Sequence, residues 1–287
     1  TVDDDGPADF HTIQEAINVA SPGDTIYVSS GTYYEHVVVN KTLSLIGVGG
    51  PIIDASLPAT VDPSAAQWNG MTILEDHCTI EGFEIRNADN FGIEIQADYG
   101  LFKENLVEGC NFAGISCYAW AHDGVSYHSS HDNSICNNTV IRNNMGALLG
   151  DAYNNLVSLN IIERSEWGIY LCEYARNNLV TKNSVSNITG TPGIAGGYGI
   201  AVGTGSHNNL IVGNNISNNV VYGISIELLG GGFPLPHDNS IHHNNFVDNT
   251  VQAYDDGINN FWDDGYSSGG NYWSDYTGVD LYSGPYQ

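Results

Sequence analysis

Asn160-Ile-Ile-Glu-Arg-Ser-Glu-Trp-Gly168-Ile-Tyr-Leu is the stretch of sequence that decides the fold, because both of its ends recur along the chain. An Asn followed by alternating apolar residues returns at Asn105, Asn138, Asn183, Asn215 and Asn245. A Gly followed by alternating residues returns at Gly114, Gly146, Gly199 and Gly223. By subtraction, successive Asn anchors lie 33, 22, 23, 32 and 30 residues apart, so a unit near 22 residues is lengthened in three intervals. Self-similarity of this kind is typical of a solenoid, in which each unit buries its apolar face against its neighbours.

The repeating unit has the pattern of short strands. Apolar residues alternate over a few positions, Asn and Gly punctuate them, and no helical apolar stripe recurs. A coil of about 22 residues with two or three short strands is the size of one turn, or rung, of a parallel β-helix. At one corner of every rung, the Asn amide is expected to bond the backbone and the Asn side chains of neighbouring rungs. The sequence therefore predicts an all-β solenoid, and the recurring Asn residues are interpreted as structural.

Composition restricts the classes of function. The chain has 287 residues, of which 41% are hydrophobic, and this is enough for the core of one solenoid. Asp and Glu number 33 against 7 Lys and Arg, which gives a formal net charge of −26. This balance disfavours nucleic acid as a partner, because phosphate binding needs clustered cations. No apolar run long enough to span a membrane is present. The acidic balance favours an extracellular surface, a salty habitat or Ca²⁺ bound by loop carboxylates, and it suggests no other cofactor.

Cysteines and glycosylation sequons bear on the compartment. The five cysteines show no Cys-x-x-Cys pair and no zinc spacing, so at least one thiol is free and most are expected to pack as small hydrophobic residues. One disulfide remains compatible with the count. Asn-x-Ser/Thr sequons begin at Asn40, Asn137, Asn187 and Asn215. They favour an extracellular or cell-surface location.

The N-terminal segment differs from the repeats. Thr12-Ile-Gln-Glu15 has the form of a capping box and precedes apolar residues at helical spacing. A short amphipathic helix is therefore predicted to close the N-terminal end of the solenoid. Strands are predicted after it at Thr25–Val28, His36–Val39 and Leu43–Ile46, and Pro51–Gly70 is interpreted as a side loop. We expect a single domain over residues 1–287, with a cap at 1–24, rungs at 25–262 and a C-terminal covering segment at 263–287.

Segments at both ends carry a family resemblance. They are Phe10-His-Thr-Ile-Gln-Glu-Ala-Ile, Pro22-Gly-Asp-Thr-Ile-Tyr-Val, Val39-Asn-Lys-Thr-Leu-Ser-Leu-Ile-Gly, Ile53-Asp-Ala and Gly270-Asn-Tyr-Trp-Ser-Asp-Tyr-Thr-Gly-Val-Asp. Over nearly its whole length the chain resembles NosD-like proteins of the carbohydrate-binding and sugar-hydrolase (CASH) group in archaeal surface proteins. The resemblance implies a right-handed parallel β-helix of the pectin-lyase-like fold. It also implies either the β-helix portion of a disaggregatase-type enzyme, which degrades envelope heteropolysaccharide, or a non-catalytic relative within a larger surface protein.

The strand after each repeat Gly arranges residues in columns. With the Gly as position zero, positions one and three are apolar and should point inward, whereas two and four should point outward. Residues of one column lie about 4.8 Å apart on successive rungs. Position two contains Glu94, Ser116, Leu148, Tyr170, Ala201 and Ser225, and position four contains Gln96, Tyr118, Gly150, Cys172, Gly203 and Glu227. Position five adds Asp151 and Glu173. We interpret this outer strand face as the candidate site.

Insertions are expected to wall this face. Ala119–Asp132 and Leu229–His237 are predicted on one side and Thr189–Gly197 on the other, so that the short rungs between them form a cleft floor. Residues expected to bind a sugar chain are Glu94, Tyr118, Trp120, Trp167, Tyr174 and Arg176. A polysaccharide is the partner that this arrangement predicts.

Two mechanisms fit the polar residues. In a glycoside hydrolase, Asp151 and Glu173 would be the paired acid and nucleophile or base, since adjacent rungs suit the roughly 5–5.5 Å separation of retaining enzymes. In a polysaccharide lyase or epimerase, a Tyr or His removes the proton beside a uronate whose charge is neutralised by Arg or Ca²⁺. The lyase candidates are Tyr118, His122, Tyr170 and Arg176. Hydrolysis is favoured, with catalytic residues Asp151, Glu173, Tyr170 and His122, because an acidic chain repels polyuronates. A non-catalytic carbohydrate-binding or surface-layer module stays open as the alternative.

Most histidines are interpreted as turn residues. His131-Asp-Asn-Ser-Ile recurs as His237-Asp-Asn-Ser-Ile in another rung, and His207-Asn-Asn-Leu is similar.

Copper delivery, which the NosD resemblance suggests, is disfavoured because the chain has only Met71 and Met145 and no Cys/His cluster of soft-ligand spacing. No metal site is predicted.

Overall fold

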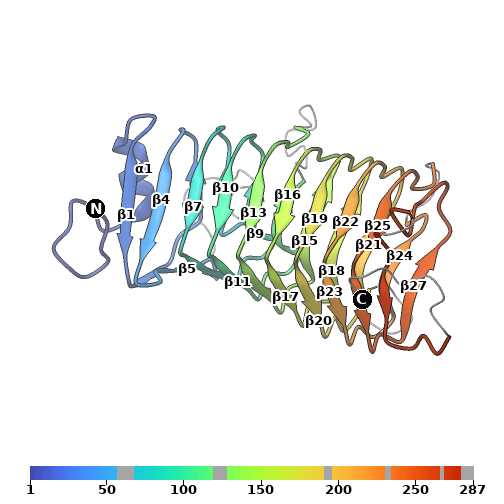
Figure 1. Cartoon of the computed structure of the whole chain (residues 1–287). Helices are drawn as coiled ribbons and strands as arrows, with labels where there is room; N and C mark the ends of the chain where they lie inside the picture. Colours follow the sequence, from blue (N-terminus) through green and yellow to red (C-terminus); the bar gives the residue numbers. More distant parts are fainter. Residues whose placement is uncertain (57–67, 119–127, 191–195, 230–233, 266–267, 279–287) are drawn as a thin grey trace.

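A computed structural model describes residues 1–56, 68–118, 128–190, 196–229, 234–265 and 268–278. The chain coils into an elongated right-handed parallel β-helix, as predicted, whose rungs follow one another from the N-terminal to the C-terminal end (Figure 1). Three parallel sheets, A, B and C, run along its length. Among the described residues, no helix has the length and apolar composition needed to cross a bilayer.

Successive rungs contribute to each sheet in turn. Sheet A consists of β1 (Thr25–Ser29), β4 (Ser44–Val48), β7 (Thr79–Glu81), β10 (Leu101–Lys103), β13 (Ser134–Cys136), β16 (Leu156–Ser158), β19 (Leu179–Thr181), β22 (Leu210–Val212) and β25 (Ser240–His242). Sheet B consists of β2 (Thr32–Tyr33), β5 (Ile52–Asp54), β8 (Glu84–Arg86), β11 (Leu106–Glu108), β14 (Thr139–Ile141), β17 (Ile161–Glu163), β20 (Ser184–Ser186), β23 (Asn215–Ser217), β26 (Asn245–Val247) and β28 (Tyr272–Trp273). Sheet C consists of β3 (Val37–Val39), β6 (Met71–Ile73), β9 (Phe91–Ile95), β12 (Ala113–Cys117), β15 (Met145–Gly150), β18 (Trp167–Cys172), β21 (Tyr198–Val202), β24 (Tyr222–Ile226) and β27 (Val251–Asp255).

The strand bounds correct one expectation. Pro51–Gly70 was expected to lie outside the rungs, but Ile52–Asp54 forms β5 and pairs with β2 and β8 in sheet B. Ile53 is completely buried, because the strand alternates like its neighbours. Proline at position 51 precedes the strand and does not interrupt it. Residues 57–67 of the expected loop lie outside the described residues.

Buried Asn ladders join the rungs at the corners. One ladder runs through Asn105, Asn138, Asn160, Asn183, Asn214, Asn244 and Asn271. A second runs through Asn133, Asn155, Asn178, Asn209, Asn239 and Asn260. The anchors Asn215 and Asn245 were therefore wrong by one residue: both are exposed first residues of strands, whereas Asn214 and Asn244 are buried. The predicted structural role of the Asn repeat is confirmed.

The repeat glycines occupy a crowded bend at the start of each sheet C strand. A Cβ added to Gly168 would lie 2.1 Å from the carbonyl oxygen of Gly199 and 2.6 Å from Val185 Cγ1. Rungs could not stack at their present spacing with a larger residue at this position. The recurring Gly therefore reflects close contact between successive rungs.

Helix α1 (Ile13–Val19) packs at the N-terminal end of the coil, and Ile13, Ala16 and Ile17 bury its apolar face (Figure 1). Thr12 caps it by accepting a hydrogen bond from the Glu15 N–H at 3.2 Å. Residues of the first rung complete both caps. The Glu35 carboxylate accepts the N–H groups of residues 13 and 14 at 2.8 and 2.9 Å. Lys41 Nζ donates to the carbonyls of residues 17, 18 and 20 at 2.8–2.9 Å. The carboxylate at the N-terminus and the ammonium at the C-terminus also interact favourably with the helix dipole.

Aromatic rings cover the last described rung. Trp273 in β28 stacks on Phe246 with ring centroids 4.7 Å apart, and Trp262 packs beside it at 5.9 Å. Asn271 continues the first ladder into this segment. Thus part of the segment expected only to cover the solenoid adds a strand to sheet B before it closes the core.

All five cysteines are free thiols. Cys78, Cys110 and Cys117 belong to the apolar core, as expected for small hydrophobic residues, and Cys172 packs in a smaller cluster outside sheet C. Burial raises the pKa values of Cys110 and Cys117 to about 12. Such thiols are poor nucleophiles at neutral pH.

Candidate functional site

Sheet C carries the predicted columns. Position two runs in register through Thr72, Glu94, Ser116, Leu148, Tyr170, Ala201, Ser225 and Tyr254. Position-one and position-three residues such as Ile115 and Cys117 lie in the core, so the inward and outward assignment is confirmed. The outer column is nevertheless mostly buried, with Glu94, Ser116 and Ser225 at 0% exposure. The outer face is therefore more covered than the alternating pattern predicts.

Glu94 is a buried carboxyl on this face. Asn69 Nδ2 donates to its Oε2 at 2.6 Å, and the same Nδ2 contacts Thr72 Oγ1 at 3.0 Å. Burial raises the pKa of Glu94 to about 7, although hydrogen bonds from Gln96 and Asn69 lower it. A carboxyl with such a pKa can accept or release a proton near neutral pH. Glu94, expected from sequence to bind substrate, is therefore a buried carboxyl held by Asn69 beneath the outer face of sheet C.

Three tyrosines lie against glycines of the next rung. A Cβ on Gly150 would meet the Tyr118 ring at 2.0 Å, and one on Gly203 would meet the Tyr170 ring and hydroxyl at 3.0 Å. Tyr174 lies in the same way over a glycine at position 205, where the distance is 2.7 Å. The position-four glycines that interrupt the column are thus spaces filled by tyrosine rings. Tyr118 and Tyr174 were predicted to bind a sugar chain, and Tyr170 was predicted to be catalytic.

An aromatic row extends from these tyrosines toward the C-terminal end of sheet C. It comprises Tyr170, Trp167, Tyr198, Tyr222 and Tyr254, and successive rings in this order have centroids 5.1, 4.8, 5.2 and 5.4 Å apart. The strands that carry it, β18, β21, β24 and β27, are consecutive in the sheet. Sequence reasoning found Trp167 and Tyr170 but missed the other three. The signal was available: Trp167, Tyr198 and Tyr222 each immediately precede a repeat Gly.

Carboxylates border the aromatic row at Tyr170. Burial raises the pKa of Tyr170 well above its usual range, and the negative charges of Glu173 and Glu227 add to the rise. Glu227 accepts a 2.5 Å hydrogen bond from Ser225 Oγ. A phenol with a raised pKa does not readily become phenolate, so Tyr170 is poorly suited to act as a base.

Asp151 and Glu173 occupy equivalent turn positions on adjacent rungs. Each follows a residue of the register pair Gly150–Cys172, and each has a left-handed φ, 47° and 50°. The Asp151 carboxylate is held by Arg176 Nη1 at 2.8 Å and by Ser129 Oγ at 2.6 Å. Glu173 is exposed. The fold brings the predicted pair to neighbouring rungs, and it also ties Asp151 to Arg176, which was expected to contact substrate.

A second polar cluster lies at the corner between sheets C and A. Asp98 Oδ1 is 3.0 Å from His128 Nε2 and accepts the His131 N–H at 2.8 Å, while its Oδ2 is 2.9 Å from His131 Nε2. His131 also stacks on Tyr153, with ring centroids 4.5 Å apart, and Arg176 Cζ lies 4.5 Å from the centroid of the same Tyr153 ring. Sequence reasoning did not identify Asp98.

The histidines at this corner form consecutive bridges. His131, Tyr153, Arg176, His207 and His237 pair in that order on successive rungs. The interpretation of the recurrent His-Asp-Asn and His-Asn-Asn segments as turns is confirmed. Predicted residues His122 and Trp120 lie outside the described residues. The structure describes the three insertions only in part. Along the chain, Ala119–Asp132 and Leu229–His237 each lie between a sheet C strand and the following sheet A strand, whereas Thr189–Gly197 lies between a sheet B strand and the following sheet C strand.

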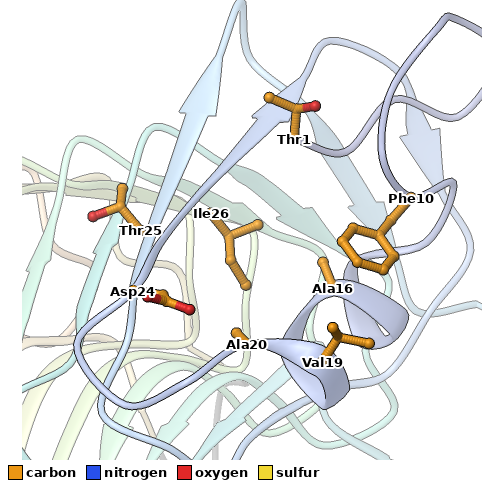
Figure 2. Close-up of a pocket in the computed structure, with 8 residues that line it drawn as sticks. All are labelled: Thr1, Phe10, Ala16, Val19, Ala20, Asp24, Thr25 and Ile26. Atoms are coloured by element: carbon orange, nitrogen blue, oxygen red, sulfur yellow. The ribbon is translucent and has the colours of Figure 1, made fainter.

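A hollow of about 250 Å³ lies at the N-terminal end, away from the aromatic row (Figure 2). Its lining comes from helix α1, from β1 and from the first residues of the chain: Thr1, Phe10, Ala16, Val19, Ala20, Asp24, Thr25 and Ile26. One carboxylate among mainly apolar and hydroxyl groups gives no acid–base pair. This hollow is a gap between the cap and the first rung.

Asp3, Asp4 and Asp5 offer carboxylate oxygens within 4.8 Å of one another near the N-terminus. Oxygen donors of this kind suit the Ca²⁺ that the composition suggested. The loop already uses two of them, because Asp3 accepts the Gly6 N–H and Asp4 accepts the Thr32 N–H. Hydrogen bonding within the loop therefore accounts for the arrangement.

Comparison with known proteins identifies the family. A family model described as periplasmic copper-binding protein (NosD) matches residues 17–278. The chain belongs to the NosD family. A cell surface glycoprotein of Methanothermus fervidus is 27% identical over 316 residues, which include 92% of this chain and 51% of that protein. The NosD chain thus spans about half the length of this curated relative.

Solved structures share the fold of the NosD chain. Pectate lyase Pel9A has a TM-score of 0.63 and 14% identity, with 94% of this chain and 76% of the lyase covered. Open reading frame 18 of Geobacillus virus E2 has a TM-score of 0.56 and 16% identity, with 88% and 56% covered. The enzymatically active domain of bacteriophage CBA120 tailspike protein 2 has a TM-score of 0.55 and 14% identity, with 89% and 41% covered. At these identities the likeness concerns the fold alone.

The family description names copper, which in its Cu(I) form takes thiolate and thioether ligands. Met71 lies in the core and Met145 packs outside sheet C, so the two thioethers are on opposite faces of the sheet. The free thiols are mostly buried and have raised pKa values. These donors do not form a soft Cu(I) site. Imidazole donors, which suit divalent ions, do come together at His242 and His243.

Proposed function

We propose that this chain is the polysaccharide-binding β-helix of a larger extracellular protein, and that a glycan lies along the aromatic row of sheet C. The row itself carries the proposal. Its five rings contact one another over consecutive strands. Trp167 is buried and supports the neighbouring rings, Tyr170, Tyr198 and Tyr222 are half-buried, and Tyr254 is exposed, so the tyrosines provide the accessible aromatic surface. Aromatic rings stack on the apolar faces of sugar rings, and carboxylates such as Glu173 and Glu227 beside the row can accept hydrogen bonds from sugar hydroxyls.

The charge of the chain selects among glycans. At −26, the surface repels polyuronates and other polyanions over the distance set by ionic screening. A neutral or weakly charged envelope or matrix polysaccharide is therefore the favoured ligand.

Two observations support a cell-surface location. The Methanothermus relative is named a cell surface glycoprotein and continues well beyond the matched region, which is consistent with further domains. All four sequon residues, Asn40, Asn137, Asn187 and Asn215, are exposed, whereas the Asn residues of the ladders are buried. Exposure is what glycan attachment requires.

Binding of archaeal envelope polysaccharides in affinity electrophoresis tests the proposal. Tyr198→Ala and Tyr222→Ala should each weaken retardation about tenfold if a stacked sugar is lost, which corresponds to roughly 1.4 kcal/mol. Tyr27→Ala is the matched control, because Tyr27 is an exposed tyrosine in β1 of sheet A. Equal loss in all three variants, or no retardation of the native protein by any neutral glycan, would refute the proposal.

Hydrolysis of the bound glycan is the second candidate. Asp151 and Glu173 support it by their equivalent places on adjacent rungs, and Glu173 lies close enough to Tyr170 to raise its pKa. A lyase using Tyr170 as base is disfavoured by the raised pKa of that residue and by the engagement of Arg176 with Asp151. Mass spectrometry of products, with and without EDTA, separates the cases. Saturated oligosaccharides that disappear in Asp151→Asn and Glu173→Gln indicate hydrolysis, products with a 4,5-double bond indicate a lyase, and binding without products indicates a non-catalytic module.

A further inference from the structure

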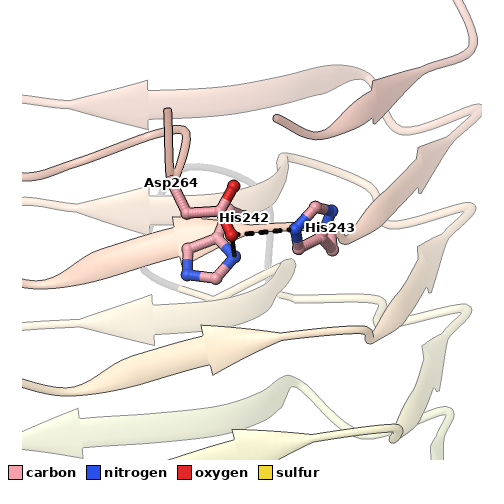
Figure 3. A group of neighbouring side chains, drawn as sticks. All are labelled: His242, His243 and Asp264. Carbon is pink, nitrogen blue, oxygen red and sulfur yellow. Dashed lines mark hydrogen bonds and ion pairs between the residues drawn. The ribbon is translucent and has the colours of Figure 1, made fainter. Parts of the chain in front are cut away.

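Two adjacent histidines and an aspartate, His242, His243 and Asp264, meet where the chain passes from β25 of sheet A to β26 of sheet B (Figure 3). His243 Nε2 lies 3.2 Å from Asp264 Oδ2, and His242 Nδ1 lies 4.0 Å from the same oxygen. One donor atom of each residue is within 4.8 Å of the other two. Asp264 follows the histidines by about one rung, so no local sequence motif joins the three.

Rung geometry places both imidazoles on the outside. His242 ends β25 and follows Ile241, which is completely buried, so alternation directs His242 outward. His243 would point inward in a continued strand, but its left-handed φ of 55° turns the chain at this point. Residues with the same φ end the corresponding sheet A strands of earlier rungs at Glu104, Asn137, Leu159 and Lys182. The turn therefore belongs to the fold and does not need histidine.

His242 has an unsatisfied polar atom. Its Nδ1 is buried and has no hydrogen-bond partner, and the side chain as a whole is only 14% exposed. The 4.0 Å distance to Asp264 Oδ2 is too long for a hydrogen bond. Buried polar atoms are rarely left in this condition without a functional reason. A cation held between the imidazoles and the carboxylate would satisfy this nitrogen.

We propose that His242 Nδ1, His243 Nε2 and Asp264 Oδ2 bind a divalent first-row transition ion of the zinc or copper(II) class. Two imidazole nitrogens and one carboxylate oxygen are the donors that such ions take in proteins, and three protein ligands leave a coordination position open. Bonds of about 2.0–2.1 Å in a tetrahedron separate the ligand atoms by about 3.3 Å. The His243–Asp264 distance of 3.2 Å already matches this value, and the His242–Asp264 distance of 4.0 Å would have to shorten on binding. Ca²⁺ fits poorly, since it prefers six to eight oxygen ligands.

A neighbouring hydroxyl holds the carboxylate in place. Ser268 Oγ donates to Asp264 Oδ2 at 2.7 Å and lies 3.2 Å from His243 Nε2. Hydrogen bonds of this kind orient metal-binding carboxylates, and their loss typically lowers metal affinity about 10–100-fold. Ser268 therefore acts on the site through Asp264.

Isothermal titration of the metal-free whole chain with Zn²⁺ and with Cu²⁺ tests the site. We expect one equivalent of either ion to bind, Cu²⁺ more tightly than Zn²⁺ as the Irving–Williams order requires, and Ca²⁺ to give no heat of binding. Cu²⁺ bound in this way should show nitrogen hyperfine structure in its electron paramagnetic resonance spectrum. His243→Asn and Asp264→Asn should each weaken binding at least tenfold, and asparagine is compatible with the left-handed backbone at position 243.

His237→Gln is the matched control, because His237 is a partly exposed imidazole 2.8 Å from the Asp238 carboxylate and, within the part of the chain that the structure describes, belongs to no cluster of three such donors. Its variant should bind the ion as tightly as the native chain. Thermal unfolding of every variant without metal confirms that the fold is retained. No binding of either ion to the native chain, or binding that persists in both His243→Asn and Asp264→Asn, would overturn the assignment.

Discussion

Asn214 Oδ1 accepts two hydrogen bonds from Asn183, one from its backbone N–H and one from its Nδ2, both at 2.9 Å. Asn214 Nδ2 in turn donates to Asn244 Oδ1 at 2.9 Å and to the Val180 carbonyl at 2.9 Å. Each ladder amide thus satisfies buried backbone groups on the rung before it and passes the contact to the rung after it. This explains why an amide is retained in a completely buried position.

Replacement of Asn214 by alanine should destabilise the protein strongly. The Asn183 backbone N–H and one of the two Asn183 Nδ2 hydrogens would be left buried without an acceptor, at a cost of about 1–3 kcal/mol each. Asn215→Ala is the matched control, since Asn215 is the next residue but is exposed. Urea unfolding should therefore show a loss of about 2–5 kcal/mol for the first variant and less than about 0.5 kcal/mol for the second. Equal losses would contradict the register of the ladder.

The comparison of Asn214 with Asn215 shows how far sequence could lead. The Asn and Gly repeats were sufficient to predict a parallel β-helix and the columns of sheet C, because each rung must place the same residue types at the same corners. They could not fix the ladder to one residue where two Asn are adjacent, since either choice fits the pattern. Burial of Glu94 and the Asp151–Arg176 ion pair depend on side-chain contacts between neighbouring rungs, which cannot be derived from the spacing of residues within one rung.

Stability should depend on pH through Glu94. Its pKa rises from 4.5 to about 7 on folding, mainly because of burial. Between these values the native state keeps a proton that the unfolded state has released, so stability falls as pH rises from 4.5 to about 7. Glu94→Gln removes this dependence and should stabilise the protein by up to about 3 kcal/mol at pH 8, with little effect at pH 4. Urea unfolding at both pH values checks this. The exposed Glu104→Gln should leave the dependence unchanged.

Lys41 should anchor helix α1 to the first rung. Its ammonium donates to three carbonyls at the helix C-terminus, at 2.8–2.9 Å. Lys41→Met keeps the apolar stem but removes these bonds, and we expect a loss of about 1–3 kcal/mol. Hydrogen exchange should accelerate first in residues 13–19. Lys182→Met, which changes an exposed lysine in another turn, should alter neither quantity.

Thiol labelling should distinguish one cysteine from the other four. Cys136 is partly exposed, whereas Cys78, Cys110, Cys117 and Cys172 are buried, and burial raises all five thiol pKa values. A disulfide reagent at pH 8 should therefore label a single thiol slowly in the native protein and all five in urea. Cys136→Ser should abolish the native signal. Rapid labelling of a second thiol would mean that a rung opens locally.

Two glycines of β21 and the turn after it should separate glycan binding from folding. A Cβ at Gly203 would lie 3.0 Å from the Tyr170 ring and hydroxyl, so Gly203→Ala forces that side chain, the first of the aromatic row, to shift by a few tenths of an ångström. A Cβ at Gly199 would lie 2.6 Å from the Gly223 carbonyl oxygen and 2.7 Å from Ile216 Cγ2, neither of which has room to move. Gly203→Ala should thus weaken polysaccharide binding several-fold with almost unchanged thermal stability, because only a partly exposed ring is displaced. Gly199→Ala should lower the melting temperature by several degrees through the strain between rungs.

Affinity electrophoresis and thermal unfolding of both variants measure the two effects. Unchanged binding in Gly203→Ala would place the glycan away from Tyr170, toward the Tyr222 and Tyr254 end of the row.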